Sequence, residues 1–168
     1  AFLQTFVRER CAIVLDPGKE YLAESRLGPV ARSAGLPGIG ELVARLRVDP
    51  RGDLTDKVIE AMTTNETSFF RDVHPFEALR THILPDLIKA RSNERALNLW
   101  CAASSSGQEP YTIAMLLREN FPALIEWRIR FIATDLSQEM LRRSREGIYS
   151  QLEVNRGLPA TLLLKYFV

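Results

Sequence analysis

The sequence reads ALNLWCAASSSGQEP from residue 96 to residue 110, and this stretch decides the fold. Its first part, Ala96–Cys101, alternates apolar side chains in the manner of a buried β-strand. The next part, 102–107, carries no side chain larger than a hydroxymethyl group. Pro110 suits the first turn of a helix, because proline has no N–H group to leave unpaired there. The stretch therefore predicts a strand, a loop whose backbone a flat ligand can approach, and a helix.

A strand, a small-residue loop and a helix form the first half of a nucleotide-binding unit. The dinucleotide fingerprint needs several glycines, and this loop has only Gly107. Glu109, at the mouth of the helix, repels phosphate and attracts a cation. A second apolar alternation, Arg128–Thr134, ends in Asp135, where such folds hydrogen-bond ribose hydroxyls. These residues predict a site for a nucleoside that carries a cationic group and no phosphate, and S-adenosylmethionine fits that description.

Taken alone, these residues also have a purely structural interpretation. Small-residue loops join strands to helices in many α/β proteins, and an acid after a strand can simply cap the next helix. The polar segment 63–72, TTNETSFFRD, is open to the same two interpretations. It can line a ligand pocket, or its threonines and asparagine can cap helix ends.

The composition sets wide bounds on function. The 168 residues suffice for one ordinary domain or two small ones. A net charge of +1 gives no overall footprint for nucleic acid, and no apolar run approaches the ~20 residues that span a bilayer. No signal-peptide pattern opens the chain. Two cysteines and two histidines favour a reducing, cytoplasmic setting and predict no metal site.

The rest of the chain reads mostly as helix. Residues 1–64 show helical spacing throughout, with an expected kink or interruption at Gly28-Pro29. This segment either packs on a larger domain as a small bundle or docks a partner. Two helical pieces are expected in 75–84 and 85–90, each beginning at a proline, and a last helix is expected in 158–167.

Helix signals also follow the second strand. Ser137 is expected to cap a helix over 138–146, and Gly147 to end it. Two parallel strands are too few for a doubly wound sheet, because such sheets are buried on both faces. Further chain after residue 168, or another molecule, is therefore expected to complete the sheet.

Several segments taken together resemble the CheR family of chemotaxis receptor methyltransferases. They are TTNETSFFR at 63–71, WCAASSSGQEPYT at 100–112, ATD at 133–135 and EGIY at 146–149. The resemblance covers nearly the whole chain in order. Other motifs of the family are expected after residue 168, so that the cofactor domain is expected to be incomplete in this chain.

The resemblance implies an α/β protein with a small N-terminal helical bundle and a Rossmann-like class I methyltransferase domain. The bundle is expected in 1–64 and a linker that lines the cofactor site in 65–78. The N-terminal part of the domain that binds S-adenosylmethionine is expected in 79–168. The family's best-known members dock receptors with a strongly basic second helix, whereas here the sequence GPVA separates Arg26 from Arg32.

Matching positions imply which residues bind the cofactor. They are Asn65, Thr67, Arg71, Ala103, Glu109 and Asp135. Arg71 is also the predicted catalytic residue, because a planar guanidinium orients a carboxylate bidentately, either that of the substrate or that of the cofactor. The alternative for Arg71 is an ordinary ion pair with Asp72 or Glu66.

The resemblance further implies methyl transfer from S-adenosylmethionine to glutamate side chains on the cytoplasmic helices of chemoreceptors, with S-adenosylhomocysteine as product. Such a transfer needs no general base, because a glutamate is ionised at neutral pH and rate comes from alignment and exclusion of water. The expected partners are receptor helices, with no nucleic acid and no direct membrane insertion. The 168 residues alone are expected to show little catalysis. The alternative is a signalling module that binds S-adenosylmethionine without turnover.

Overall fold

The structure is a computed structural model that describes residues 2–16 and 18–168. The chain divides into two compact units between Thr64 and Asn65. Residues 65–78, which the sequence analysis treats as a linker, belong to the second unit. Their role as the lining of a cofactor site stays a prediction.

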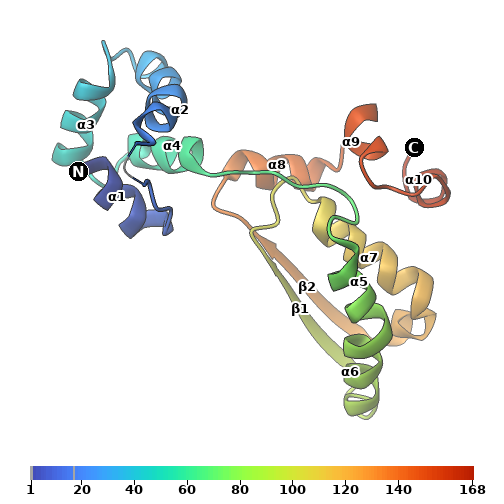
Figure 1. Cartoon of the computed structure of the whole chain (residues 1–168). Coiled ribbons are helices and arrows are strands. Elements are labelled where there is room, and N and C mark those ends of the chain that lie inside the picture. The colour runs from blue at the N-terminus through green and yellow to red at the C-terminus, as the bar shows by residue number, and fades with distance from the viewer. Residues whose placement is uncertain (1, 17) are drawn as a thin grey trace. The chain divides into compact units, whose positions relative to one another are not determined.

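The first unit is a helical bundle, as predicted (Figure 1). Its described helices are α1 (Phe2–Cys11), α2 (Glu20–Ser33), α3 (Ile39–Val48) and α4 (Asp53–Met62). Each helix contributes apolar side chains to one core, in which Val7, Leu27, Leu42 and Val58 are completely buried. Burying a side chain of this size stabilises a fold by about 1.5–3 kcal/mol, so this core accounts for the packing of the bundle.

The sequence predicted a kink or an interruption of the second helix at Gly28-Pro29, and the interruption does not occur. Helix α2 runs without a break through Gly28 and Pro29, with Leu27 and Ala31 buried on either side of them. Proline removes one helical hydrogen bond, and the burial of these neighbours offsets that loss. Arg26 of the same helix donates to the carbonyl of Met62 at 2.6 Å and closes the end of α4, where a cation is favourable.

The first helices of the second unit follow one another without a gap. They are α5 (Val73–Ala78), the π-helical turn η1 (Leu79–Ile83) and α6 (Leu84–Ala90). Both predicted pieces are helical and Pro85 lies in the first turn of α6, as expected, but the π turn joins the pieces without a gap. The π turn that precedes this proline changes the local hydrogen-bond spacing, which lets the chain pass a residue without an N–H group.

Two parallel strands form the sheet of the second unit. They are β1 (Ala96–Ala102) and β2 (Arg128–Thr134), in a register that pairs Ala96 with Arg128 and Ala102 with Thr134. Both strands were predicted. Helix α7 (Gln108–Asn120) and the 3₁₀ turn η2 (Pro122–Glu126) connect them.

The residues that the structure describes cover one face of this sheet and leave much of the other exposed. Figure 1 shows α7 and the α5–α6 stretch on the same side of the strands, and the buried Leu97 of β1 packs there against Leu84 and Leu116. On the opposite face Trp100 is 73% exposed and Ile132 is 40% exposed. The buried face fixes the two strand ends, and with them the loops that follow.

Three helices follow the second strand. They are α8 (Gln138–Glu146), α9 (Gln151–Asn155) and α10 (Ala160–Tyr166). The caps of α8 are as predicted, since the Ser137 side chain accepts from the N–H of Met140 and Gly147 is left-handed at φ +63°. The last helix is shorter than predicted, and α9 was not predicted. No helix among residues 2–16 and 18–168 has the length and apolar character to cross a bilayer.

Candidate cofactor site

The carboxyl ends of both strands meet at one edge of the sheet. The N–H of Ser104 donates to the carbonyl of Thr134 at 2.9 Å, and the N–H of Ser105 donates to Oδ2 of Asp135 at 2.7 Å. The other oxygen of Asp135 accepts from the N–H of Ser137 at 2.9 Å. A carboxylate offers more acceptor positions than these two bonds use, so Asp135 can still accept from ligand hydroxyls.

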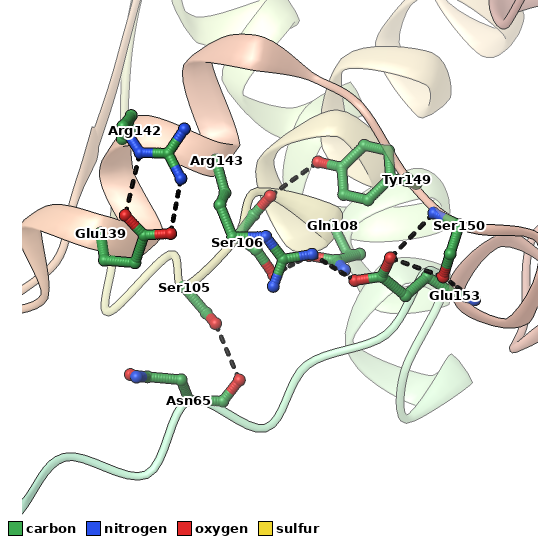
Figure 2. A network of polar contacts seen from close by, with 10 residues as sticks. All are labelled: Asn65, Ser105, Ser106, Gln108, Glu139, Arg142, Arg143, Tyr149, Ser150 and Glu153. Carbon is green, nitrogen blue, oxygen red and sulfur yellow. Dashed lines mark hydrogen bonds and ion pairs between the residues drawn. The ribbon is translucent and has the colours of Figure 1, made fainter. Parts of the chain in front are cut away.

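The segment after the first unit reaches the same loop. Oγ of Ser105 donates to the backbone carbonyl of Asn65 at 2.9 Å, as Figure 2 shows. Further along the segment, the N–H of Phe70 donates to Oγ1 of Thr112 on α7 at 3.1 Å. Thr67 is half-buried between these two anchor points. The structure therefore brings the segment of Asn65 and Thr67 to the loop that Asp135 binds.

The backbone of the small-residue loop is strongly bent. Ala103 and Ser105 lie at φ +58° and +49°, and Gly107 lies at φ +99°. A Cβ on Gly107 would lie 2.5 Å from Oγ of Ser144, so only glycine fits at that position. Ala103 is exposed, which leaves its backbone open to a ligand. Within the described chain, the buried hydroxyl of Ser104 has no hydrogen-bond partner, which is consistent with a polar ligand in this region.

Tyr149, for which no role was predicted, fixes the loop through a hydrogen bond. Its hydroxyl donates to the carbonyl of Ser106 at 2.7 Å (Figure 2). Burial raises the pKa of the Tyr149 phenol, so the donor stays protonated. Tyr149 belongs to the EGIY motif, but the motif does not predict a contact with a loop 43 residues earlier in the sequence.

Glu109 lies in the first turn of α7 with an exposed side chain, where a cationic group of a ligand can reach it. Its Oε1 accepts from the Sγ–H of Cys101 at 3.0 Å. Cys101 is only 4% exposed, and burial, assisted by Glu109, raises the pKa of the Cys101 thiol to about 12. The thiol therefore stays protonated at neutral pH and donates to Glu109, a contact that was not predicted from the sequence.

This thiol predicts a loss of stability at alkaline pH. Below its ordinary pKa of 9.0 the thiol is protonated in both the folded and the unfolded chain. Between that value and about 12 only the unfolded chain releases the proton, so the free energy of unfolding falls as the pH rises. Between pH 8 and about pH 10.5, the melting temperature is expected to fall further in the natural chain than in Cys101→Ser. If the melting temperature fell equally in both proteins, the burial of this thiol would be contradicted.

Arg71 forms the ion pairs with Glu66 and Asp72 that were the alternative prediction for this residue. Its guanidinium donates to the carbonyl of Glu66 at 2.7 Å and lies 3.6 Å from the Glu66 carboxylate and 4.0 Å from that of Asp72. The side chain is 47% exposed. The guanidinium has several N–H groups, and among the described residues its one hydrogen bond is to a neutral carbonyl, so it can still bind an anion.

A cavity of about 550 Å³ lies elsewhere in the second unit, lined by Phe121, Trp127, Ile129 and Tyr166 among others. None of the residues predicted to bind the cofactor lines it. In the part of the chain that the structure describes, no cluster of histidine, cysteine, aspartate or glutamate could hold a metal ion. The candidate site is therefore the edge of the sheet formed by the loop, Asp135 and the segment of Asn65.

A parallel strand–loop–helix unit, with an acid after the second strand, defines the class of Rossmann-like nucleotide-binding domains. The model of the CheR methyltransferase SAM-binding domain matches residues 65–168, and that of the CheR methyltransferase all-alpha domain matches residues 1–63. The chain belongs to the CheR methyltransferase family. This confirms the resemblance drawn from the sequence motifs and the predicted order of a helical bundle and an S-adenosylmethionine domain.

Curated relatives agree with the family assignment. The chain is 42% identical to chemotaxis protein methyltransferase Cher2 of Pseudomonas putida and 44% identical to chemotaxis protein methyltransferase 1 of Pseudomonas aeruginosa. Each match covers 98% of this chain and 60% of the relative. A chemotaxis protein methyltransferase of Vibrio parahaemolyticus is 40% identical over 91% of the chain and 55% of its own length. The chain thus spans about 60% of the length of the first two relatives.

Proposed function

We propose that this protein transfers a methyl group from S-adenosylmethionine to glutamate side chains on the cytoplasmic helices of chemoreceptors. The observation that carries the proposal is the joining of three segments at one sheet edge. Ser105 binds the Asp135 carboxylate through its N–H and the Asn65 carbonyl through its hydroxyl. The family and the names of the relatives support the reaction class.

The residues present fit this cofactor, each through its own chemistry. Asp135 would accept hydrogen bonds from the ribose hydroxyls, and Glu109 would bind the ammonium group. Asn65, Thr67 and the exposed backbone at Ala103 would line the remaining surface. Arg71 would hold a carboxylate, either that of the cofactor or that of the receptor glutamate.

S-adenosylmethionine, when bound, supplies a methyl group on a positively charged sulfur, and displacement by a carboxylate oxygen gives a methyl ester and S-adenosylhomocysteine. A free glutamate has a pKa of about 4.3, so its carboxylate is ionised at neutral pH. The protein therefore needs no group that removes a proton. Its residues orient the carboxylate and exclude water from the reacting atoms.

The test measures binding and transfer separately. Titration calorimetry with S-adenosylhomocysteine is expected to show binding at a single site. Full-length protein, incubated with radiolabelled S-adenosylmethionine and a receptor cytoplasmic fragment, is expected to label the fragment. The label is expected to leave as volatile methanol in mild base, because an ester hydrolyses there and a methylated amine does not. We expect the 168 residues alone to transfer little, since the relatives are longer.

Different results would contradict different parts of the proposal. Binding without any transfer by the full-length protein would favour a non-catalytic signalling module. Transfer of a base-stable label would contradict the carboxylate as acceptor. Absence of binding would contradict the cofactor site itself.

A further inference from the structure

Glu66 lies between two arginines from distant parts of the second unit. Its Oε1 accepts from the guanidinium of Arg156 at 2.9 Å, whereas its Oε2 lies 3.6 Å from the guanidinium of Arg71. Only the first of these distances is that of a hydrogen bond. The Glu66 carboxylate is therefore hydrogen-bonded to Arg156 and forms only a longer ion pair with Arg71, which donates instead to the neutral carbonyl of Glu66 at 2.7 Å.

The backbone next to Arg156 also lies close to the segment that contains Glu66 and Arg71, so the position of Arg156 does not depend on its long side chain alone. The neighbouring Gly157 lies at φ +97°, and a Cβ there would lie 2.1 Å from the carbonyl oxygen of Phe69. Phe69 is only 1% exposed and makes edge contacts with the rings of Tyr149 and Phe167, with centroids 5.1 and 5.6 Å apart. The turn after α9 is thus fixed against the segment that contains Glu66 and Arg71.

The consequence for Arg71 is electrostatic. Without a second cation, Glu66 would have Arg71 as its nearest partner and would compete with any anionic ligand for that guanidinium. Asp72 also faces Arg71, but at 4.0 Å and with 83% of its side chain exposed it competes weakly. We propose that Arg156 is a positioning residue that binds the Glu66 carboxylate and so leaves Arg71 available for the carboxylate of the ligand.

This inference rests on the proposed function, because it assumes that Arg71 binds an anionic group of the cofactor or substrate. The test is a double-mutant cycle read out as the dissociation constant of S-adenosylhomocysteine, measured by titration calorimetry on the full-length protein. Arg156→Ala is expected to weaken binding about two- to fivefold, since all three side chains are partly exposed. Glu66→Gln, alone or combined with Arg156→Ala, is expected to bind at least as tightly as the natural protein.

Two further measurements separate this role from a structural one. Arg145→Ala on α8 removes the same charge from an exposed arginine and is expected to leave the dissociation constant unchanged. The effect of Arg156→Ala is expected to shrink as salt is raised, because the competing pair is exposed to solvent. A loss of packing at the turn after α9 would not respond to salt in this way and would not be repaired by Glu66→Gln.

The contrary outcomes are distinct. Unchanged binding in Arg156→Ala, or a double variant as weak as Arg156→Ala, would overturn the positioning role while leaving the proposed function intact. Failure of the natural protein to bind S-adenosylhomocysteine would overturn the proposed function, and the role of Arg156 with it.

Discussion

Asp135→Ala is expected to weaken the binding of S-adenosylhomocysteine about 100-fold or more. Hydrogen bonds to a charged group contribute about 1.5–3 kcal/mol each, and alanine would remove those proposed to the ribose. It would also leave the N–H of Ser105 without the acceptor that it meets at 2.7 Å, which loosens the loop. Titration calorimetry of the natural and variant proteins, each checked for a normal melting curve, measures the effect.

Tyr149→Phe is the control that separates ligand contact from loop order. It removes the hydrogen bond of the Tyr149 hydroxyl to Ser106, at 2.7 Å, but leaves the Asp135 carboxylate in place. We expect a loss of binding of about tenfold or less, since one neutral hydrogen bond contributes about 1 kcal/mol. If both variants lost the same affinity, Asp135 would act only by ordering the loop, and its proposed contact with the ribose would be wrong.

The parts of this protein that were predictable from sequence are those fixed by local pattern. The alternation in Ala96–Cys101 and in Arg128–Thr134 identified both strands, because one face of each had to be buried. Since parallel strands end at the same edge, the small-residue loop and Asp135 had to come close, and the bond between Ser105 and Asp135 is the result. The roles of the predicted cofactor residues stay predictions.

Contacts between distant segments were not predictable, because no local pattern specifies them. Glu66 and Arg156 are 90 positions apart, and Tyr149 is 43 positions from the carbonyl that it binds. Cys101 and Glu109 are close in sequence, yet their contact depends on the turn of the loop between them. The interruption considered at Gly28-Pro29 does not occur for a related reason, since the buried Leu27 and Ala31 outweigh the local cost of proline.

Gly157→Ala is expected to destabilise the second unit by about 3 kcal/mol or more. A left-handed residue other than glycine costs roughly 1–3 kcal/mol, and here a Cβ would in addition lie 2.1 Å from the carbonyl oxygen of Phe69. The carbonyl of Phe69 belongs to the backbone and lies next to a buried ring, so it cannot move aside as a flexible side chain would. A loss of this size lowers the melting temperature by roughly 10 °C or more in a unit of this size.

Gly147→Ala, in the same unit, isolates the contribution of that contact. Gly147 is also left-handed, at φ +63°, but a Cβ there would lie 3.2 Å from the hydroxyl of Tyr111, a side chain that can yield by a few tenths of an ångström. We expect it to cost about 1 kcal/mol, as for alanine at a left-handed helix end. If the two variants had the same melting temperature, the close approach of Gly157 to Phe69 would be wrong.

Because Phe69 lies between Asn65 and Arg71, a displaced Phe69 carbonyl is also expected to weaken cofactor binding in Gly157→Ala and not in Gly147→Ala.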